Sequence, residues 1–137
     1  MKPFQVILLA GCTMLASCGK TNTGDVAGKG GNSQVTLTIQ HHASQKNIYY
    51  AKVFVKYNAT DLPANGVYDD SVLCTHVFPA DTSLTAIFTS LKNGNYVFFA
   101  DGKDSLFKEK VKGLLPYALA SQKNDTTTLY VDEYGPL

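Results

Sequence analysis

The sequence predicts an all-β fold, a single antiparallel β-sandwich of about seven strands. Apolar and polar residues alternate in several short runs, which is the period of a strand with one buried face. Glycine, proline, asparagine and aspartate separate these runs at spacings of about 8 to 12 residues, as in sandwiches. No long stretch has the period of an amphipathic helix. We therefore expect one sandwich domain over residues 34–137.

The first two predicted strands show the alternation most clearly. In Val35–Gln40 the apolar residues are Val35, Leu37 and Ile39, which we expect to face the core. In Tyr49–Tyr57 one face carries Ala51, Val53, Val55 and Tyr57, and the other carries Lys52, Phe54 and Lys56.

Three further runs follow in the middle of the chain. Residues 58–66 have loop chemistry, and Ser71–Phe78 alternates again until Pro79-Ala80-Asp81 ends it. The next two runs, Leu84–Leu91 and Tyr96–Ala100, flank Lys92-Asn93-Gly94-Asn95. Because Asn-Gly between alternating runs is typical of a tight β-turn, this pattern predicts a hairpin.

The C-terminal third predicts the remaining strands. Asp101–Asp104 is expected to turn the chain. The stretch Ser105–Lys112 fits either a short helix or an edge strand, and its alternating lysines favour the edge strand. Leu115–Leu119 and Thr126–Val131 complete the set. The expected core side chains are those of Leu37, Val53, Val55, Phe88, Leu91, Tyr96 and Phe98.

Two stretches resemble a known family of sandwiches. These are Ala51-Lys52-Val53-Phe54-Val55-Lys56-Tyr57, and the pattern Ala86-x-Phe88-x-x-Leu91-Lys92-x-Gly94-x-Tyr96-x-Phe98-x-Ala100. Together they resemble prealbumin-like (transthyretin-like, carboxypeptidase-regulatory-like) domains over about a hundred residues. An immunoglobulin-like sandwich shares most of the pattern, although its Cys and Trp landmarks are missing here. The resemblance implies a fold and leaves function open, because such modules serve many roles.

The N-terminal residues resemble a bacterial lipoprotein signal. Lys2 precedes an apolar run, Phe4–Leu15, which is too short to span a bilayer, and Leu15-Ala16-Ser17-Cys18 resembles the lipobox. The resemblance implies a signal peptide over residues 1–17, removed by cleavage before Cys18, and acyl chains such as palmitate on Cys18. A second match ends at Cys12, but it leaves too short an apolar segment. An ordinary secretory signal is the other alternative.

Residues 18–33 are expected to form a lipidated cysteine and a flexible tether. The stretch from Gly19 to Ser33 holds five glycines and a single larger apolar residue, Val26. Such a composition favours a flexible chain. Two or three acyl chains hold a protein firmly on a membrane. The expected location is therefore the cell envelope of a Gram-negative bacterium, on the outer membrane, with the leaflet left open.

Composition argues against several classes of partner. All twelve basic residues are lysines, against eleven acidic residues. A net charge near zero without arginine disfavours nucleic acid as a partner. Once Cys18 is acylated, Cys74 is expected to remain as a buried, inert thiol.

No catalytic or metal site is predicted, and no cofactor. The sequence shows no G-x-S-x-G, H-E-x-x-H or paired-carboxylate motif, so we do not expect an enzyme. His41 and His42, with His76 and Asp69-Asp70, were candidate metal ligands, but adjacent strand residues point to opposite faces. Asp101–Asp104 lacks the ligand pattern of a calcium loop. Ser71, Ser105 and Thr126 lie in short matches to an O-glycosylation sequon, which chance explains equally well.

Aromatic residues give the most specific hypothesis about function. On the face opposite the expected core lie Tyr49, Tyr50, Phe54, Val97 and Phe99. Either other parts of the chain cover this face or a partner does. The chain is thus expected to be a membrane-anchored, non-enzymatic binding or accessory module for an envelope protein or glycan. The alternative is a structural envelope lipoprotein without a specific ligand.

Overall fold

The computed structural model describes residues 26–43, 48, 50–75, 84–104, 109–121 and 123–133. Within these residues the regular structure is strand throughout, and no helix is long and apolar enough to cross a membrane. The seven strands are β1 (Lys29–His41), β2 (Tyr50–Tyr57), β3 (Asp70–Thr75), β4 (Leu84–Leu91), β5 (Gly94–Lys103), β6 (Lys110–Leu119) and β7 (Asn124–Val131). The all-β prediction is confirmed.

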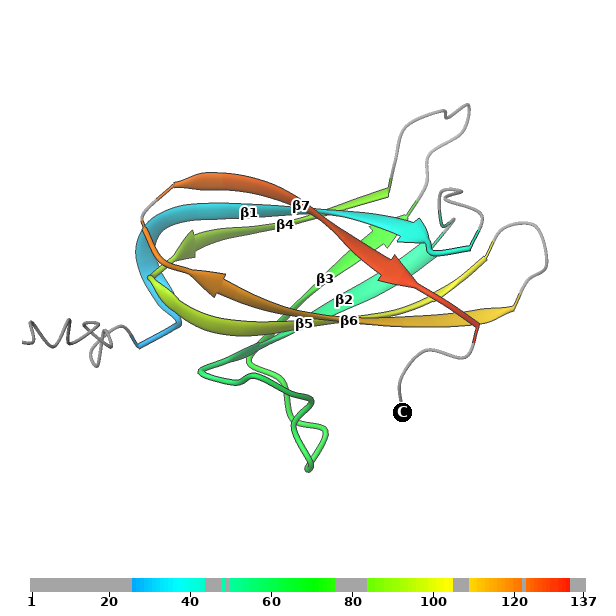
Figure 1. Ribbon diagram of the computed structural model, residues 1–137, viewed down its shortest axis with the longest axis horizontal. Helices are drawn as coiled ribbons and strands as arrows, with labels where there is room; N and C mark the ends of the chain where they lie inside the picture. Colours follow the sequence, from blue (N-terminus) through cyan, green and yellow to red (C-terminus); the bar gives the residue numbers. More distant parts are fainter. Residues whose placement is uncertain are drawn as a thin grey trace, which may run out of the picture.

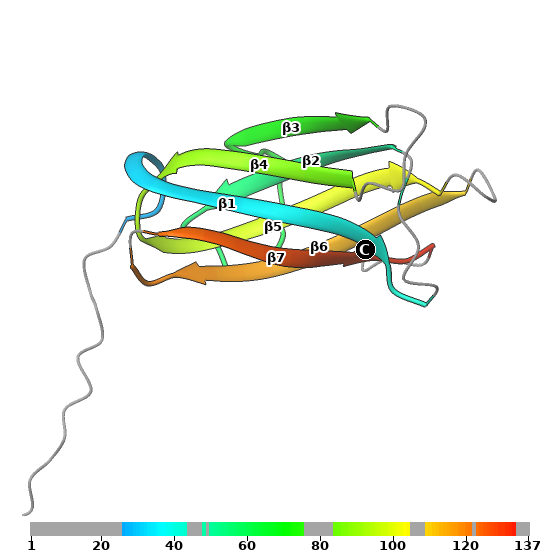
Figure 2. The ribbon, with the colours of Figure 1, turned by 90° about the horizontal axis from the view of Figure 1, so that it is seen from above.

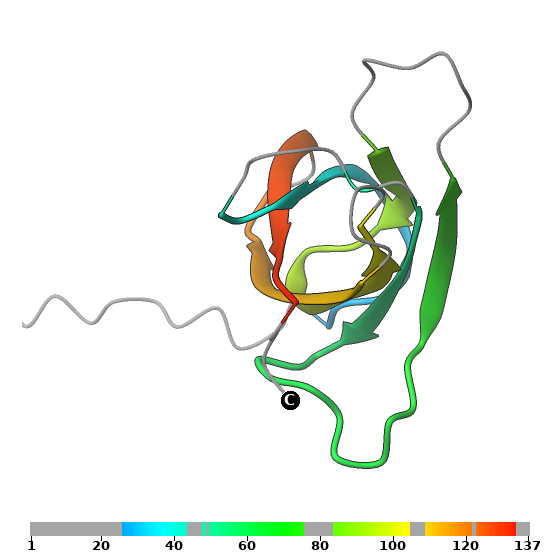
Figure 3. The ribbon, with the colours of Figure 1, turned by 90° about the vertical axis from the view of Figure 1, so that its right-hand side faces the viewer.

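The strands form two sheets packed face to face. One sheet has the order β4-β1-β7 and the other the order β3-β2-β5-β6. Neighbouring strands are antiparallel except for β1 and β7, which run parallel. Figure 1 shows the two layers, and Figure 3 shows the strands curving around a common interior. The predicted sandwich is therefore present.

The interior contains the side chains that the alternation assigned to it. The rings of Phe88 and Phe98 meet across the two sheets with centroids 5.2 Å apart. All seven predicted core residues are at most 1% exposed: Leu37, Val53, Val55, Phe88, Leu91, Tyr96 and Phe98. The prediction of these seven core side chains is confirmed.

The Asn93-Gly94 turn does not form the predicted hairpin. It joins β4 to β5, and these strands belong to different sheets, so the chain crosses from one layer to the other. Gly94 has φ +142°, and a Cβ atom there would lie 2.6 Å from the amide nitrogen of Ala27. The glycine is therefore needed for close backbone approach as well as for the turn.

Two C-terminal predictions were also wrong in detail. Residues 101–103 continue β5 instead of turning the chain, and β6 runs without a break from Lys110 to Leu119. The expectation that its lysine-bearing start lies on a sheet edge is confirmed. A Cβ atom on Gly113 would lie 2.0 Å from the carbonyl oxygen of Tyr130, so glycine there lets β6 approach β7. Two backbone hydrogen bonds of 2.9 Å between Lys112 and Asp132 join the same strands.

The sandwich begins earlier than predicted. Strand β1 starts at Lys29, and Ala27 is buried, so the last part of the predicted tether belongs to the domain. The side chain of Asn58 accepts a hydrogen bond from the Ala27 amide at 2.7 Å and donates one to its carbonyl at 3.2 Å. The glycines in this segment form backbone hydrogen bonds but add no alternation of apolar side chains. The sequence pattern therefore does not reveal the start of β1. Residues 1–25, which include Cys18, lie outside the described part.

Two neighbouring tyrosines differ in how their hydroxyl groups are satisfied. The Tyr96 hydroxyl donates to the Lys92 carbonyl at 2.6 Å and accepts from the Gly28 amide at 3.1 Å. The Tyr57 ring lies 5.6 Å away, and within the described residues its buried hydroxyl finds no hydrogen-bond partner. Burial, with Asp70 and Asp69 adding to it, raises the pKa of Tyr57 to about 12.

We predict opposite outcomes for the same substitution at these two positions. Tyr96→Phe removes two hydrogen bonds and should lower the free energy of unfolding by about 1 to 2 kcal/mol. Tyr57→Phe removes an unsatisfied hydroxyl, so it should leave stability unchanged or increase it. Urea unfolding of both variants checks this. Equal destabilisation by the two substitutions would contradict the hydrogen-bond assignment.

Candidate functional site

The outer face of the four-stranded sheet carries an aromatic cluster made of Phe54, Tyr68 and Phe99. Strands β2 and β5 pair Phe54 with Phe99, and their rings are 6.2 Å apart. Tyr68 belongs to the segment between β2 and β3, and it lies 4.9 Å from Phe54 and 6.0 Å from Phe99. All three side chains are partly buried. They form an apolar centre on a sheet face that points away from the core.

Other apolar side chains surround the aromatic cluster. Leu73 on β3 is 59% exposed, and Tyr50 on β2 is 37% exposed. Tyr50 lies four positions before Phe54 on β2 and so shares its outer face. Leu73 is paired with Lys52 in the β2–β3 register, which puts it on the same face. Lys52 lies between Tyr50 and Phe54 on β2. Its ammonium is 5.0 Å from the centre of the Phe54 ring, a cation–π distance.

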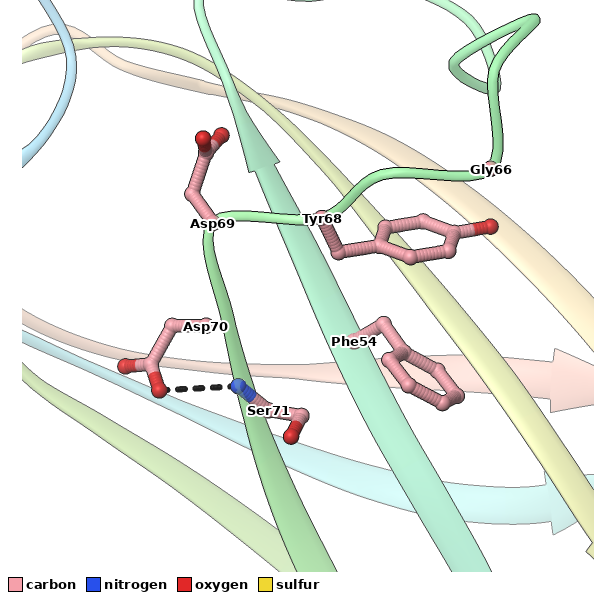
Figure 4. A pocket seen from close by; sticks show the side chains of 6 residues that line it. All are labelled: Phe54, Gly66, Tyr68, Asp69, Asp70 and Ser71. Carbon is pink, nitrogen blue, oxygen red and sulfur yellow. Dashed lines mark hydrogen bonds between the residues drawn. The ribbon is translucent and has the colours of Figure 1, made fainter.

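Two shallow hollows lie on either side of Phe54. The larger, of about 390 Å³, is lined by Phe54, Gly66, Tyr68, Asp69, Asp70 and Ser71. Figure 4 shows the Tyr68 ring standing beside the Phe54 ring, with Asp69, Asp70 and Ser71 following along the chain. The smaller, of about 180 Å³, is lined by Tyr50, Lys52, Phe54, Asp101, Gly102, Lys103 and Lys110.

The carboxylates beside the larger hollow are already engaged. Asp69 accepts hydrogen bonds from the Tyr57 amide at 2.7 Å and from the Lys56 ammonium at 3.1 Å. Asp70 pairs with Lys29 at 2.9 Å and accepts from the Ser71 amide at 2.8 Å. The hydrogen bond from Lys29 holds the pKa of Asp70 below its usual range. These carboxylates therefore fix the 58–69 segment against the strands.

The predicted partner face is only partly available. Phe54 and Phe99 meet as expected, and Tyr50 is exposed on the same face. Val97 is fully buried, which corrects its assignment to an exposed surface. It lies in register between Lys56 and Pro116, and the Lys56 stem is held by its ion pair with Asp69. Tyr49 lies outside the described residues.

Sequence reasoning missed Tyr68. It lies in a segment that was treated as loop, and alternation gives no information on where a loop residue packs. Burial, with a contribution from Asp101, raises the pKa of Tyr68. An aromatic residue two positions after the Asn65-Gly66 pair is the one available signal.

The residues once considered as metal ligands do not come together. His41 is buried at the end of β1, and His42 is exposed beside Asp132. Asp69 and Asp70 lie elsewhere, near the C-terminal end of β2. His76 lies outside the described residues. Instead, His41 joins two carboxylates that were not expected beside it, Asp104 and Glu133. The backbone amide of Glu133 and the hydrogen bond from His41 hold the pKa of Glu133 below its usual range.

Comparison with known proteins gives no relative. No protein-family model matches the chain, and no curated protein or solved structure does. The geometry of the sandwich and its outer face therefore supports the functional proposal without help from homology.

Proposed function

We propose that the chain is a bacterial envelope lipoprotein, held on the outer membrane by acyl chains on Cys18. Its sandwich acts without catalysis as a binding module for a protein partner. The anchor is supported by the lipobox-like Leu15-Ala16-Ser17-Cys18 after a short apolar run. Buried Ala27 belongs to the domain, so at most eight residues, 19 to 26, separate the domain from Cys18. The domain would thus be held close to the membrane.

The aromatic cluster is the observation that carries the binding role. Protein interfaces have an apolar centre enriched in tyrosine and phenylalanine, surrounded by a polar rim. Here the centre is Phe54, Tyr68 and Phe99, with exposed Leu73 beside it. Lys52, Lys103 and Lys110 line the smaller hollow beside this centre and supply polar groups at its border.

A glycan is the second candidate partner, and the larger hollow favours it. Ligand sites combine aromatic walls with a few polar groups. The hollow is bordered by the Phe54 and Tyr68 rings and by Ser71, whereas the Asp69 and Asp70 carboxylates point away from the rings (Figure 4). A structural lipoprotein without a ligand is the remaining alternative, and the experiment below separates it from both.

The strand order supports the prealbumin-like alternative within the sandwich class. In immunoglobulin domains the first two strands belong to the same sheet, together with the fourth and fifth. Here β1 and β2 lie in different sheets, and β2 pairs with both β3 and β5. This order differs from the immunoglobulin arrangement just described, and the difference supports the prealbumin-like family that we propose.

The binding role predicts that the outer face of the four-stranded sheet is needed for partner binding and that the outer face of the three-stranded sheet is not. Tyr68→Ser with Leu73→Ser should weaken partner binding about 30-fold or more, the effect of losing roughly 2 kcal/mol at a hot spot. The control, Ile87→Ser with Tyr130→Ser, removes apolar side chains that are 47% and 46% exposed on the other sheet. Recovery of a neighbour protein from detergent-solubilised membranes, and binding to a glycan array, measure the effect.

Three outcomes decide between the candidates. Loss of a protein neighbour in the first variant alone supports the protein partner, whereas loss of glycan binding alone supports the second candidate. If neither variant changes recovery or binding, the chain is a structural lipoprotein and the binding proposal is wrong. Melting curves of both variants must remain close to that of the unmodified chain for the comparison to hold.

A further inference from the structure

Three strand ends bring an imidazole and two carboxylates together at one end of the sandwich. His41 ends β1, Asp104 follows β5, and Glu133 follows β7. Their ligand atoms all lie within 4.8 Å of one another. In Figure 2 the strands β1, β5 and β7 end at the same end of the sandwich, opposite the start of β1. The residues are far apart in sequence, so the fold alone creates this cluster.

The cluster is buried to a degree unusual for its chemistry. His41 is 4% exposed and Asp104 is 6% exposed, and the Glu133 side chain is 29% exposed. Buried ionisable groups are normally paired or bound to metal. One imidazole beside two carboxylates is a ligand set that suits a divalent cation.

We propose that His41, Asp104 and Glu133 bind one divalent transition-metal cation of the Zn²⁺ class. Imidazole suits zinc and other first-row metals, and carboxylate oxygens complete such sites. Zinc with three protein ligands keeps a fourth position for water or for a group of another molecule. The proposal is independent of the partner face and goes beyond the function proposed above.

The geometry of the cluster is close to what the cation requires. The Nε2 atom of His41 and the Oε1 atom of Glu133 are 2.6 Å apart, a hydrogen-bond distance. Tetrahedral ligands at about 2.1 Å from zinc are separated by roughly 3.3 Å. The cation thus replaces the shared proton, and the two atoms separate by under about 1 Å. Glu133 follows the strand and is partly exposed, so it is the ligand best able to move.

Metal binding here would connect the two sheets. Strands β1 and β7 belong to the three-stranded sheet, and β5 belongs to the four-stranded sheet. A ligand that binds the folded state and not the unfolded state raises stability. We therefore expect Zn²⁺ to bind directly and also to raise the melting temperature.

Calorimetric titration of the chelator-treated full chain with Zn²⁺ tests the proposal. The expected result is one equivalent bound and a higher melting temperature. Glu133→Gln and Asp104→Asn preserve shape while removing the charge, and each should weaken binding at least tenfold. His42→Gln is the matched control, because His42 is an exposed neighbour with 68% of its side chain accessible. That variant should bind Zn²⁺ like the unmodified chain.

Other results would overturn the site. If the unmodified chain binds no Zn²⁺, or if only His42→Gln weakens binding, the cluster is a proton-linked contact between strand ends. If Asp104→Asn fails to fold, the partly exposed Glu133→Gln variant still decides, since its unchanged affinity would contradict the assignment. Circular dichroism without metal verifies that each variant keeps the β spectrum.

Discussion

Phe98→Ala should lower the free energy of unfolding by about 3 to 5 kcal/mol, the cost of truncating a fully packed phenylalanine. Phe98 is 0% exposed, and its ring lies 5.2 Å from Phe88 on the opposite sheet and 6.1 Å from Tyr96. Truncation leaves a cavity at the point where both sheets meet. Since a domain of this size is stable by about 5 to 15 kcal/mol, the loss is large.

Phe54→Ala is the matched control for this substitution. Phe54 pairs with Phe99 on the outer side of the same sheet and is only partly buried, so its truncation should cost clearly less. Urea unfolding followed by circular dichroism compares the two. A Phe98→Ala variant that is as stable as Phe54→Ala would contradict the assignment of the core.

Cys18→Ala should abolish lipid attachment. The substitution removes the thiol that the proposed anchor requires. The protein should remain unprocessed or be released in soluble form. Fractionation of cells and intact-mass measurement of the mature chain follow both effects.

Cys12→Ala is the control for the anchor. A signal ending at Cys12 would have too short an apolar segment, so this variant should be processed and lipidated normally. A mature chain that begins at Cys12, or one that carries no lipid mass, would show that the Cys18 assignment is wrong.

The core side chains could be predicted from the sequence because apolar and polar residues alternate along a strand that has one buried face. Leu37, Val53 and Phe98 were assigned to the core by period alone, and all are 0% exposed. Period does not reveal which strands are neighbours. The Asn93-Gly94 turn was therefore taken for a hairpin, although it connects two strands in different sheets.

The errors at the outer face have a different cause. Val97 has the position of an exposed residue in its strand, yet it is fully buried, flanked in register by Lys56 and Pro116. Tyr68 joins Phe54 and Phe99 from a segment without periodicity. Contacts of this kind depend on the path of a connecting segment, which a single sequence does not specify.

The buried cluster was not predictable for the same reason. His41 was considered, but Asp104 was assigned to a turn and Glu133 was not considered. Their ligand atoms meet because three strands end at the same place, and this follows from strand order and length together.

The central claim, that the outer face of the four-stranded sheet binds a partner, is tested most directly by cross-linking in intact cells. A photoreactive residue at position 73 replaces a leucine that is 59% exposed on this face, and one at position 87 replaces an isoleucine that is 47% exposed on the other sheet. We predict a discrete cross-linked species from position 73 that is lost with Tyr68→Ser, and none from position 87. Equal products from both positions, or none from position 73, would contradict the claim.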